Sequence, residues 1–258
     1  MSDDSMVINF HDAVLYQSDL KLLHDGNWLN DSCINYGITR LAVQGQSSLF
    51  NLQYVDPSVV SFFMHQLTPG EDDDEMIVLY KNWNIASSEK SKTPTILFVP
   101  INDNNAIGFG SGSQNMYDGN HWSLLVTIIN NGILTSFHLD SSSNYNGIAS
   151  SQVHKRLRYI VELGISGKIE KYVDIIECKT PQQKNGYDCG LHCLIAAEAI
   201  SRLFWHATQE TLETFQNNNV SRIQESLEDS TKSFVNSFKN DIGVVARKRL
   251  LKSIETET

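Results

Sequence analysis

The spacing of hydrophobic and polar residues divides the chain into three parts. From residue 8 to about 66 the apolar residues mostly follow a helical period, and Asp31 or Ser32 can cap one of these helices. β-rich runs follow between about residues 95 and 205, at 95–101, 121–129, 133–141 and 171–178. A helix near 151–163 separates the last two runs, and from about 206 to 258 the pattern is helical again. We therefore expect a helical part, a sheet and a helical extension.

Two features of the second half concern its helices. The segment 190–205 is apolar on nearly all sides, which predicts a central buried helix whose N-terminus lies deep in the protein. Further on, Ser221 and Gln224 fit a capping box at the start of another helix. A solvated last turn is expected for the basic residues near the C-terminus, which are Arg247, Lys248, Arg249 and Lys252.

Composition and charge restrict the class of protein. The 258 residues are 41% hydrophobic and 19% charged, which is enough to bury a substantial core in one domain spanning 1–258. No apolar run approaches the length of a membrane span, and the acidic N-terminus lacks the positive charge of a signal peptide. We expect a soluble intracellular monomer, cytoplasmic or nuclear. The formal charge of −10 argues against nucleic acid as the principal partner and favours a basic one.

The four cysteines are too few for a disulfide scaffold, and an intracellular compartment would keep them reduced. Cys33, Cys178 and Cys193 fit small buried hydrophobic positions. Cys189, His192 and Cys193 are spaced so that they could share one helix face as zinc ligands, but no paired CxxC or HxxxH supplies the remaining ligands. A catalytic thiol is the other interpretation of Cys189.

The runs 121–129 and 133–141 should form a hairpin through the intervening Asn-Asn-Gly. In the register that places His121 opposite Asp140, one face is apolar and the other mostly polar, and a one-residue slip would scramble this separation. The preferred register therefore puts the imidazole beside the carboxylate at the open end of the hairpin, as a base with its orienting group. A surface pair without a catalytic role is the alternative.

Cys189 favours the catalytic interpretation of this pair. Turn-forming residues end where the buried helix begins, so the thiol lies at a helix N-terminus, whose dipole lowers a cysteine pKa and favours the thiolate. Gly190 would let a substrate backbone approach closely. His192 could serve as the base instead, but it is one turn away on the same helix and has no evident carboxylate partner.

Four ordered blocks carry a more specific resemblance, namely Trp28-Leu29-Asn30-Asp31, HWSLLV at 121–126, Leu139-Asp140-Ser141 and PQQKNGYDCG at 181–190. Over roughly residues 12–205 this set closely resembles the Ulp/SENP family of ubiquitin-like-modifier proteases. The resemblance implies an α+β, papain-like fold with a mostly antiparallel central sheet. It also implies a triad of Cys189, His121 and Asp140. Gln183 would bind the oxyanion together with the Cys189 backbone N–H.

The resemblance also implies how substrate is held. In this family two tryptophans cover a narrow tunnel that accepts a C-terminal diglycine, and by position they match Trp28 and Trp122. Plain core aromatics are the alternative, and the hairpin register points Trp122 at the apolar face. Asp31 matches the family's acidic residue that meets the substrate tail, although its position equally suits a helix cap.

The stretch VPINDNN at 99–105, which leads through a glycine-rich loop to the HWSLLV block, is similar to the deneddylase branch of the family. The acidic charge agrees, because SUMO is acidic whereas the neddylation modifier and ubiquitin present basic faces. A longer connection at 104–120 and the C-terminal extension depart from the family pattern. We expect hydrolysis after the diglycine of a ubiquitin-like modifier, without a cofactor or metal.

Three alternatives remain open at this point. A SUMO-specific protease would use the same site on another modifier. A non-catalytic modifier-binding module on the same fold is disfavoured, because a pure binder need not keep Cys189, His121, Asp140 and Gln183 together. An acyltransferase using the same triad would require an acyl-CoA.

Overall fold

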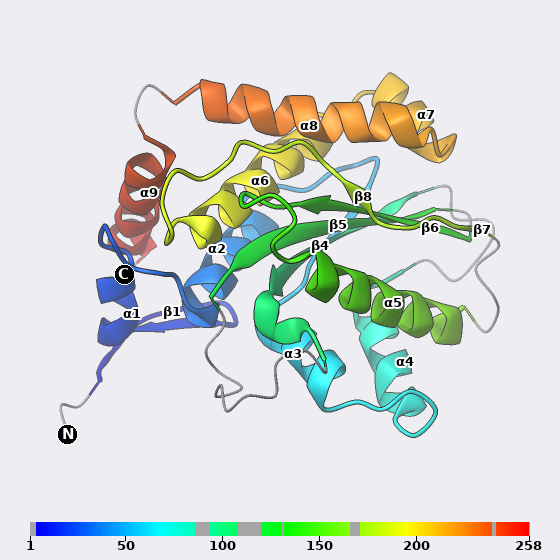
Figure 1. The fold of residues 1–258 in the computed structure, drawn as a ribbon, viewed down its shortest axis with the longest axis horizontal. Helices are drawn as coiled ribbons and strands as arrows, with labels where there is room; N and C mark the ends of the chain where they lie inside the picture. The colour runs from blue at the N-terminus through cyan, green and yellow to red at the C-terminus, as the bar shows by residue number, and fades with distance from the viewer. Residues whose placement is uncertain are drawn as a thin grey trace.

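The computed structural model of the chain describes residues 4–85, 93–107, 120–130, 132–165, 171–238 and 241–257. A central sheet lies between two groups of helices (Figure 1). Most of the glycine-rich connection predicted at 104–120 lies outside the described residues, apart from a short 3-10 helix at Asp103–Asn105 and the residues next to it.

The N-terminal part contains helices and three short strands. Its elements are β1 (Met6–Phe10), β2 (Ala13–Tyr16), α1 (Gln17–Leu22), α2 (Asp31–Gln44), β3 (Asn51–Tyr54) and α3 (Pro57–His65). The expectation of helices alone was therefore wrong for the strands. The side chain of Asn30 accepts a hydrogen bond from the Cys33 backbone N–H at 3.0 Å, so Asn30 caps α2 in place of Asp31 or Ser32.

The long strands of the sheet are β4 (Thr95–Asn102), β5 (Trp122–Asn130) and β6 (Ile133–Leu139), and they pair antiparallel. The short strands pair parallel at the edges: β3 with β4, and both β7 (Lys171–Tyr172) and β8 (Ile176–Glu177) with β6. The sheet is therefore mixed, and antiparallel among its long strands. The single strand predicted at 171–178 is two separate short strands.

The hairpin register differs from the predicted one by two residues. Leu124 pairs with Leu139 and Asn130 with Ile133, so that His121 is not directly opposite Asp140. Gly132 has a φ of 70°, and the chain reverses within the two positions between Asn130 and Ile133. Because side chains alternate with a period of two, a shift of two leaves every side chain on its predicted face.

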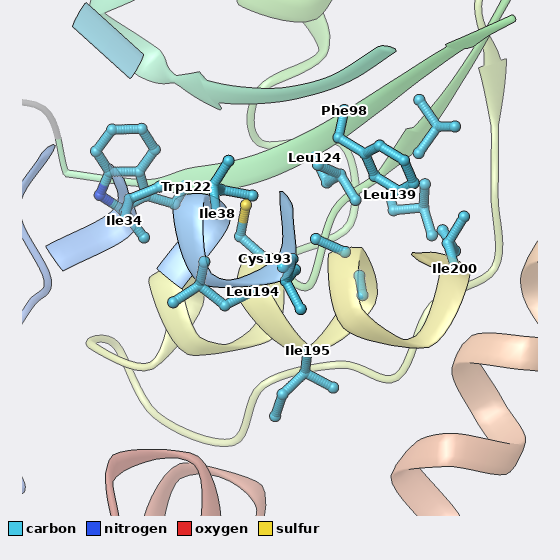
Figure 2. Close-up of a cluster of buried hydrophobic side chains, with 14 of the residues drawn as sticks. Ile34, Ile38, Phe98, Trp122, Leu124, Leu139, Cys193, Leu194, Ile195 and Ile200 are labelled. Carbon is cyan, nitrogen blue, oxygen red and sulfur yellow. The ribbon is translucent and has the colours of Figure 1, made fainter. Parts of the chain in front are cut away.

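The sheet separates two hydrophobic cores. One face packs against α2 and α6 (Cys189–Trp205), and the other against α3, α4 (Asp73–Asn82) and α5 (Gly147–Gly164). Every residue of β4 and β5 is buried. Figure 2 shows part of the first core, including Ile34, Phe98, Trp122, Leu124, Leu139 and Leu194. The buried helix predicted at 190–205 is confirmed. The ends of the strands that lie beside this helix are therefore held in place by close packing.

The C-terminal extension forms α7 (Gln209–Gln216), α8 (Val220–Asn236) and α9 (Ile242–Glu257). The Asn219 side chain accepts from the Arg222 backbone N–H at 3.3 Å and caps α8, so the capping box predicted for Ser221 and Gln224 was wrong. The prediction of a solvated basic turn was also wrong for Arg247, whose exposed fraction is 3%. Helix α9 packs against α6 beside the N-terminal hairpin (Figure 1).

Candidate active site

The Cys189 thiol lies at the N-terminus of a buried helix, as the sequence predicts. Cys189 is the first residue of α6, and its exposed fraction is 1%. Backbone N–H groups in the first turn of a helix have no partner within the helix, and together with the helix dipole they stabilise a nearby negative charge. The Cys189 sulfur therefore lies where the helix backbone can stabilise a developing negative charge.

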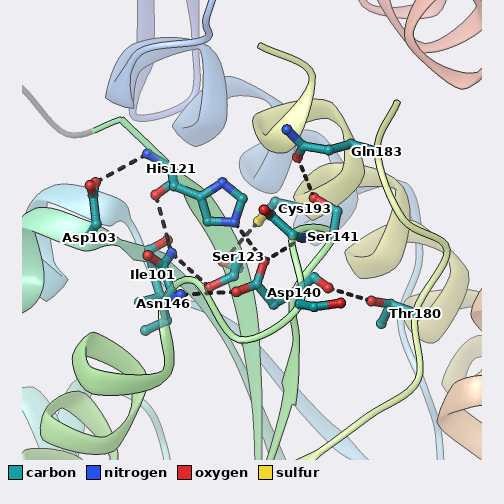
Figure 3. Close-up of polar contacts among 12 residues, drawn as sticks. Ile101, Asp103, His121, Ser123, Asp140, Ser141, Asn146, Thr180, Gln183 and Cys193 are labelled. Carbon is teal, nitrogen blue, oxygen red and sulfur yellow. Dashed lines mark hydrogen bonds and ion pairs between the residues drawn. The ribbon is translucent and has the colours of Figure 1, made fainter. Parts of the chain in front are cut away.

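His121 stands between this thiol and a carboxylate. The Nε2 atom of His121 lies 2.6 Å from Oδ1 of Asp140, and the ring also forms a hydrogen bond with the Cys189 thiol. Figure 3 shows the imidazole pointing at Asp140. His121 directly precedes β5 and Asp140 directly follows β6, so the two are diagonal neighbours on one face of the hairpin.

These contacts determine the protonation of the pair. Burial lowers the pKa of His121, but hydrogen bonds with Asp140 and Cys189 outweigh it and raise this pKa to about 9. Burial raises the pKa of Asp140, but hydrogen bonds from His121 and from the backbone N–H groups of Asn146 and Ser142 outweigh it and lower this pKa. The imidazolium and the carboxylate are therefore the stable forms near neutral pH.

A pH profile tests this electrostatic arrangement. Because the His121 pKa lies above its ordinary value of 6.5, the imidazolium persists up to about pH 9, and we expect kcat/KM to fall as pH rises through that value. Asp140→Asn removes the charge that holds the proton, so its alkaline limb should move to lower pH, with about a 10²-fold loss of kcat/KM at neutral pH.

Asp103→Asn is the matched control for this experiment. The Asp103 carboxylate accepts from the His121 backbone N–H at 3.1 Å but does not hold the ring, so its alkaline limb should stay at the wild-type position. An alkaline limb that is identical in wild type and Asp140→Asn would contradict the assigned role of Asp140.

Asn146 fixes both members of the pair, and no motif in the sequence marks it. Its backbone N–H donates to Asp140 Oδ2 at 3.0 Å, and its side-chain amide donates to the carbonyls of His121 and Ile101, both at 3.2 Å, and to Ser123 Oγ at 3.0 Å (Figure 3). The residue sits in an Asn-Tyr-Asn-Gly stretch that reads as an ordinary turn. Asn146 is thus a positioning residue for the pair.

Two other histidines lie near the site, His138 and His192, and neither is placed to act as the base. His138 bonds Ser123 Oγ through Nε2 at 2.9 Å and Glu177 through Nδ1 at 2.9 Å, so it does not face the sulfur. Burial lowers the pKa of His192, which remains on α6 one turn from the thiol. The structure therefore places His121, and neither of these, at Cys189.

The Gln183 side chain is held at both ends beside the site. Its Oε1 accepts from Ser141 Oγ at 2.8 Å and its Nε2 donates to the Asn185 carbonyl at 2.6 Å. A primary amide nitrogen carries two hydrogens, so one N–H remains for another acceptor. The two contacts fix the orientation of the amide before any substrate binds.

Trp28, Trp122 and Asp31 border one groove of about 930 Å³. Trp28 is 51% exposed and donates from Nε1 to the Gly186 carbonyl at 2.6 Å, so it is not a core aromatic. Trp122 is 4% exposed and donates to the Leu29 carbonyl at 2.9 Å. Partial burial and the neighbouring Asp56 carboxylate raise the pKa of Asp31. The groove thus combines two anchored indoles with a carboxylate.

Gly190 does not face this groove. A Cβ atom at Gly190 would lie 3.0 Å from Leu29 Cβ and 3.1 Å from Ile34 Cδ1, both inside the protein. Close packing of α6 against the segment before α2 accounts for the glycine at this position. The geometry gives no support to the substrate contact predicted for it.

The remaining cysteines differ from Cys189 in their surroundings. Burial raises the pKa of the Cys33 thiol to about 12, and it also raises the pKa values of Cys178 and Cys193. These thiols are therefore poor nucleophiles near neutral pH. Within the described ranges, no group of three or more His, Cys, Asp or Glu residues is placed to hold a metal ion. In the same part of the chain, no helix is both long and apolar enough to cross a membrane.

A thiol at a helix N-terminus, paired with an imidazole and a carboxylate on an α+β fold, is the architecture of a cysteine protease. Residues 27–235 match the family model described as the Ulp1 protease family, C-terminal catalytic domain. The chain belongs to this family of cysteine proteases, and the papain-like α+β fold expected from the sequence is confirmed.

The chain is also similar to individual proteases. Sentrin-specific protease 8 from Homo sapiens is 28% identical over 210 residues, which cover 81% of this chain and 87% of that protein. NEDD8-specific protease 1 from Arabidopsis thaliana is 30% identical, over 79% of this chain and 78% of its own length. The crystal structure of the C-terminal Ulp1 protease domain in complex with Smt3, the yeast orthologue of SUMO, has a TM-score of 0.57 at 18% identity, covering 90% of this chain and 89% of that one. At this identity the likeness shows the fold.

Proposed function

We propose that this protease hydrolyses the bond after the C-terminal diglycine of NEDD8, with Cys189 as nucleophile, His121 as base, Asp140 as the group that orients the base, and Gln183 as oxyanion donor. The placement of the His121 ring between the Cys189 thiol and the Asp140 carboxylate carries the proposal. The similarity to the protein named NEDD8-specific protease 1 supports NEDD8 as the modifier.

The contacts support a two-step reaction. The Cys189 thiolate, its proton held on His121, attacks the carbonyl carbon of the terminal glycine. The oxyanion then accepts hydrogen bonds from the free N–H of the Gln183 amide and from the Cys189 backbone. As the C–N bond breaks, the imidazolium gives its proton to the leaving amine, and a thioester remains on Cys189. Water attacks the thioester and passes its proton to His121, and the thiolate leaves.

The groove supports the proposed binding of the modifier tail. Trp28 donates a hydrogen bond to the Gly186 carbonyl and Trp122 to the Leu29 carbonyl, so both indoles that border the groove are held in place. Asp31 lies at the edge of the same groove, and we propose that it binds a cationic residue of the modifier tail. All four thiols are free, which suits a reducing compartment such as the cytoplasm or the nucleus.

The preference of the enzyme for NEDD8 over SUMO directly tests the proposed modifier. We expect kcat/KM for NEDD8 to exceed that for SUMO by more than about tenfold, because an enzyme with a charge of −10 attracts a basic modifier and repels an acidic one. Asp31→Asn should lower the ratio of kcat/KM for NEDD8 to that for SUMO by about 2- to 5-fold. The effect is modest because the carboxylate is partly solvated. The measurement compares C-terminal fluorogenic conjugates of both modifiers at low and moderate salt.

Glu75→Gln on α4 removes the same charge from an exposed position and serves as the control. It should lower the encounter rate slightly and leave the preference at moderate salt unchanged. Equal or faster processing of SUMO by the wild type would reject NEDD8 as the modifier and leave the protease assignment standing.

A further inference from the structure

We propose that Arg247 of α9 is a positioning residue for Cys189, acting through the neighbouring Asp188. The inference rests on the proposed role of Cys189 and adds a residue from outside the segment 27–235 that the family model matches. Arg247 Nη2 lies 2.8 Å from Asp188 Oδ1, and the side chains of both residues are almost fully buried. Asp188 directly precedes the nucleophile in the chain.

The same guanidinium also holds the segment that leads to Trp28. Its Nη1 donates to the carbonyls of Leu22 at 2.7 Å and His24 at 2.8 Å, and its Nη2 donates to the carbonyl of Asn27 at 2.7 Å. The Arg247 side chain therefore connects α9 both to the segment before Trp28, at the edge of the groove, and to the start of α6. Because a guanidinium presents five donors in a rigid fork, it can fix three backbone carbonyls and a carboxylate at once.

The Asp188 carboxylate pairs with Arg247 and does not cap its own helix, α6. It occupies the N-cap position of α6, but its side chain makes no capping hydrogen bond. Its Oδ2 instead accepts from Asn185 Nδ2 at 2.9 Å. A Cβ atom at Gly243 would clash with the same Oδ2, so the glycine lets α9 approach Asp188 closely. Gly243 and Arg247 are one turn apart on α9, and both meet the Asp188 carboxylate.

The chemical consequence concerns the charge beside the thiolate. A buried carboxylate next to Cys189 would repel a negative charge on the sulfur if it had no partner, and the Arg247 guanidinium balances that carboxylate. Other titratable groups surround the two residues: Tyr187 and His192 interact with Asp188, and His121 and Cys193 interact with Cys189. Beyond them, Asp140 interacts with His121, and Asp241 interacts with His192. Arg247 adds the guanidinium charge that lies directly against the Asp188 carboxylate.

The first arm of the test removes the cation. Arg247→Met keeps most of the apolar volume, and we expect about a 10- to 100-fold loss of kcat/KM for a NEDD8 conjugate, mostly in kcat. The midpoint pH of Cys189 alkylation by iodoacetamide, followed by mass spectrometry of the Cys189 peptide, should rise. Arg249→Met, which removes an ion pair with Glu198 and ring contacts with Phe234 and Phe238, is the matched control and should leave both readouts at wild-type values.

The second arm removes the carboxylate. Asp188→Asn leaves the cation beside the thiol, so the alkylation midpoint should fall below the wild-type value. The double variant Asp188→Asn with Arg247→Met removes both charges and should return the midpoint towards wild type. Arg247→Lys keeps the charge but not the four hydrogen bonds, so it should keep the midpoint and lose part of kcat. These variants carry the test if Arg247→Met does not fold.

The outcomes separate this proposal from the proposed function. Wild-type kcat and midpoint in Arg247→Met, an equal loss in Arg249→Met, or an Asp188→Asn midpoint that does not fall would each overturn the role of Arg247, while an active wild type leaves the protease assignment intact. An inactive wild type would overturn the proposed function itself.

Discussion

Cys189→Ala is expected to lower kcat/KM for a NEDD8 conjugate by at least about 10⁴-fold. The substitution removes the atom that forms the thioester. The first turn of α6 and the groove bordered by Trp28 and Trp122 remain in place. Binding of NEDD8, measured by titration calorimetry, should therefore stay within about twofold of wild type, since no group that holds the modifier tail is changed.

Cys193→Ala is the matched control for this variant. Cys193 lies one turn further along α6 and is also buried, but its sulfur faces the Ser123 carbonyl at 3.3 Å. The truncation should cost about 1 kcal/mol of folding free energy or somewhat more and leave kcat close to wild type. Turnover by Cys189→Ala within tenfold of wild type would refute the assignment of the nucleophile.

His121→Gln is expected to lower kcat/KM by about 10³-fold at neutral pH. The amide cannot hold the thiol proton, and it loses the charged contact with Asp140 that measures 2.6 Å in the native protein. Single-turnover acylation should slow by a similar factor, because the base acts before the thioester forms. Stopped-flow assays with a fluorogenic NEDD8 conjugate give both rates.

His192→Gln tests the alternative base. His192 is on the same helix as Cys189, and its pKa is lowered chiefly by burial, so it is largely neutral where the enzyme works. We expect less than about a threefold loss in kcat for this variant. If His192→Gln were as inactive as His121→Gln, the assignment of His121 as the sole base would be wrong.

The features of the site that the sequence predicts are those with a local pattern. The apolar run at 190–205 identifies the buried helix and places Cys189 at its start, and the alternation along the two strands puts His121 and Asp140 on one face. The same alternation could not detect a register shift of two, because such a shift restores every face. The turn conformation at Gly132 decides the register, and no hydrophobic pattern encodes it.

Helix caps were misassigned by one or two positions for a chemical reason. Asn30 and Asn219 are the observed caps, next to Asp31 and close to Ser221, which have side chains of nearly equal capping strength. In both helices, which residue becomes the cap depends on the direction from which the preceding loop enters the helix. Tertiary packing sets that direction.

The supporting residues of the site could not be read from the sequence. Asn146 lies in a turn, and its role arises because α5 starts beside the open end of the hairpin. Arg247 is 59 positions from Asp188 and sits in a run of basic residues typical of a solvated helix. Both roles depend on contacts between distant segments, and single-sequence periodicity carries no information on such contacts.

Covalent labelling with modifiers tests both the nucleophile Cys189 and the preference for NEDD8. NEDD8, SUMO and ubiquitin, each carrying an electrophilic C-terminus, are incubated with the wild-type protein, and the adducts are identified by intact mass and peptide mapping. We expect a single NEDD8 adduct on Cys189 that forms faster than either other adduct and is absent from Cys189→Ala. An adduct on another cysteine, or no adduct with any of the three modifiers, would contradict it.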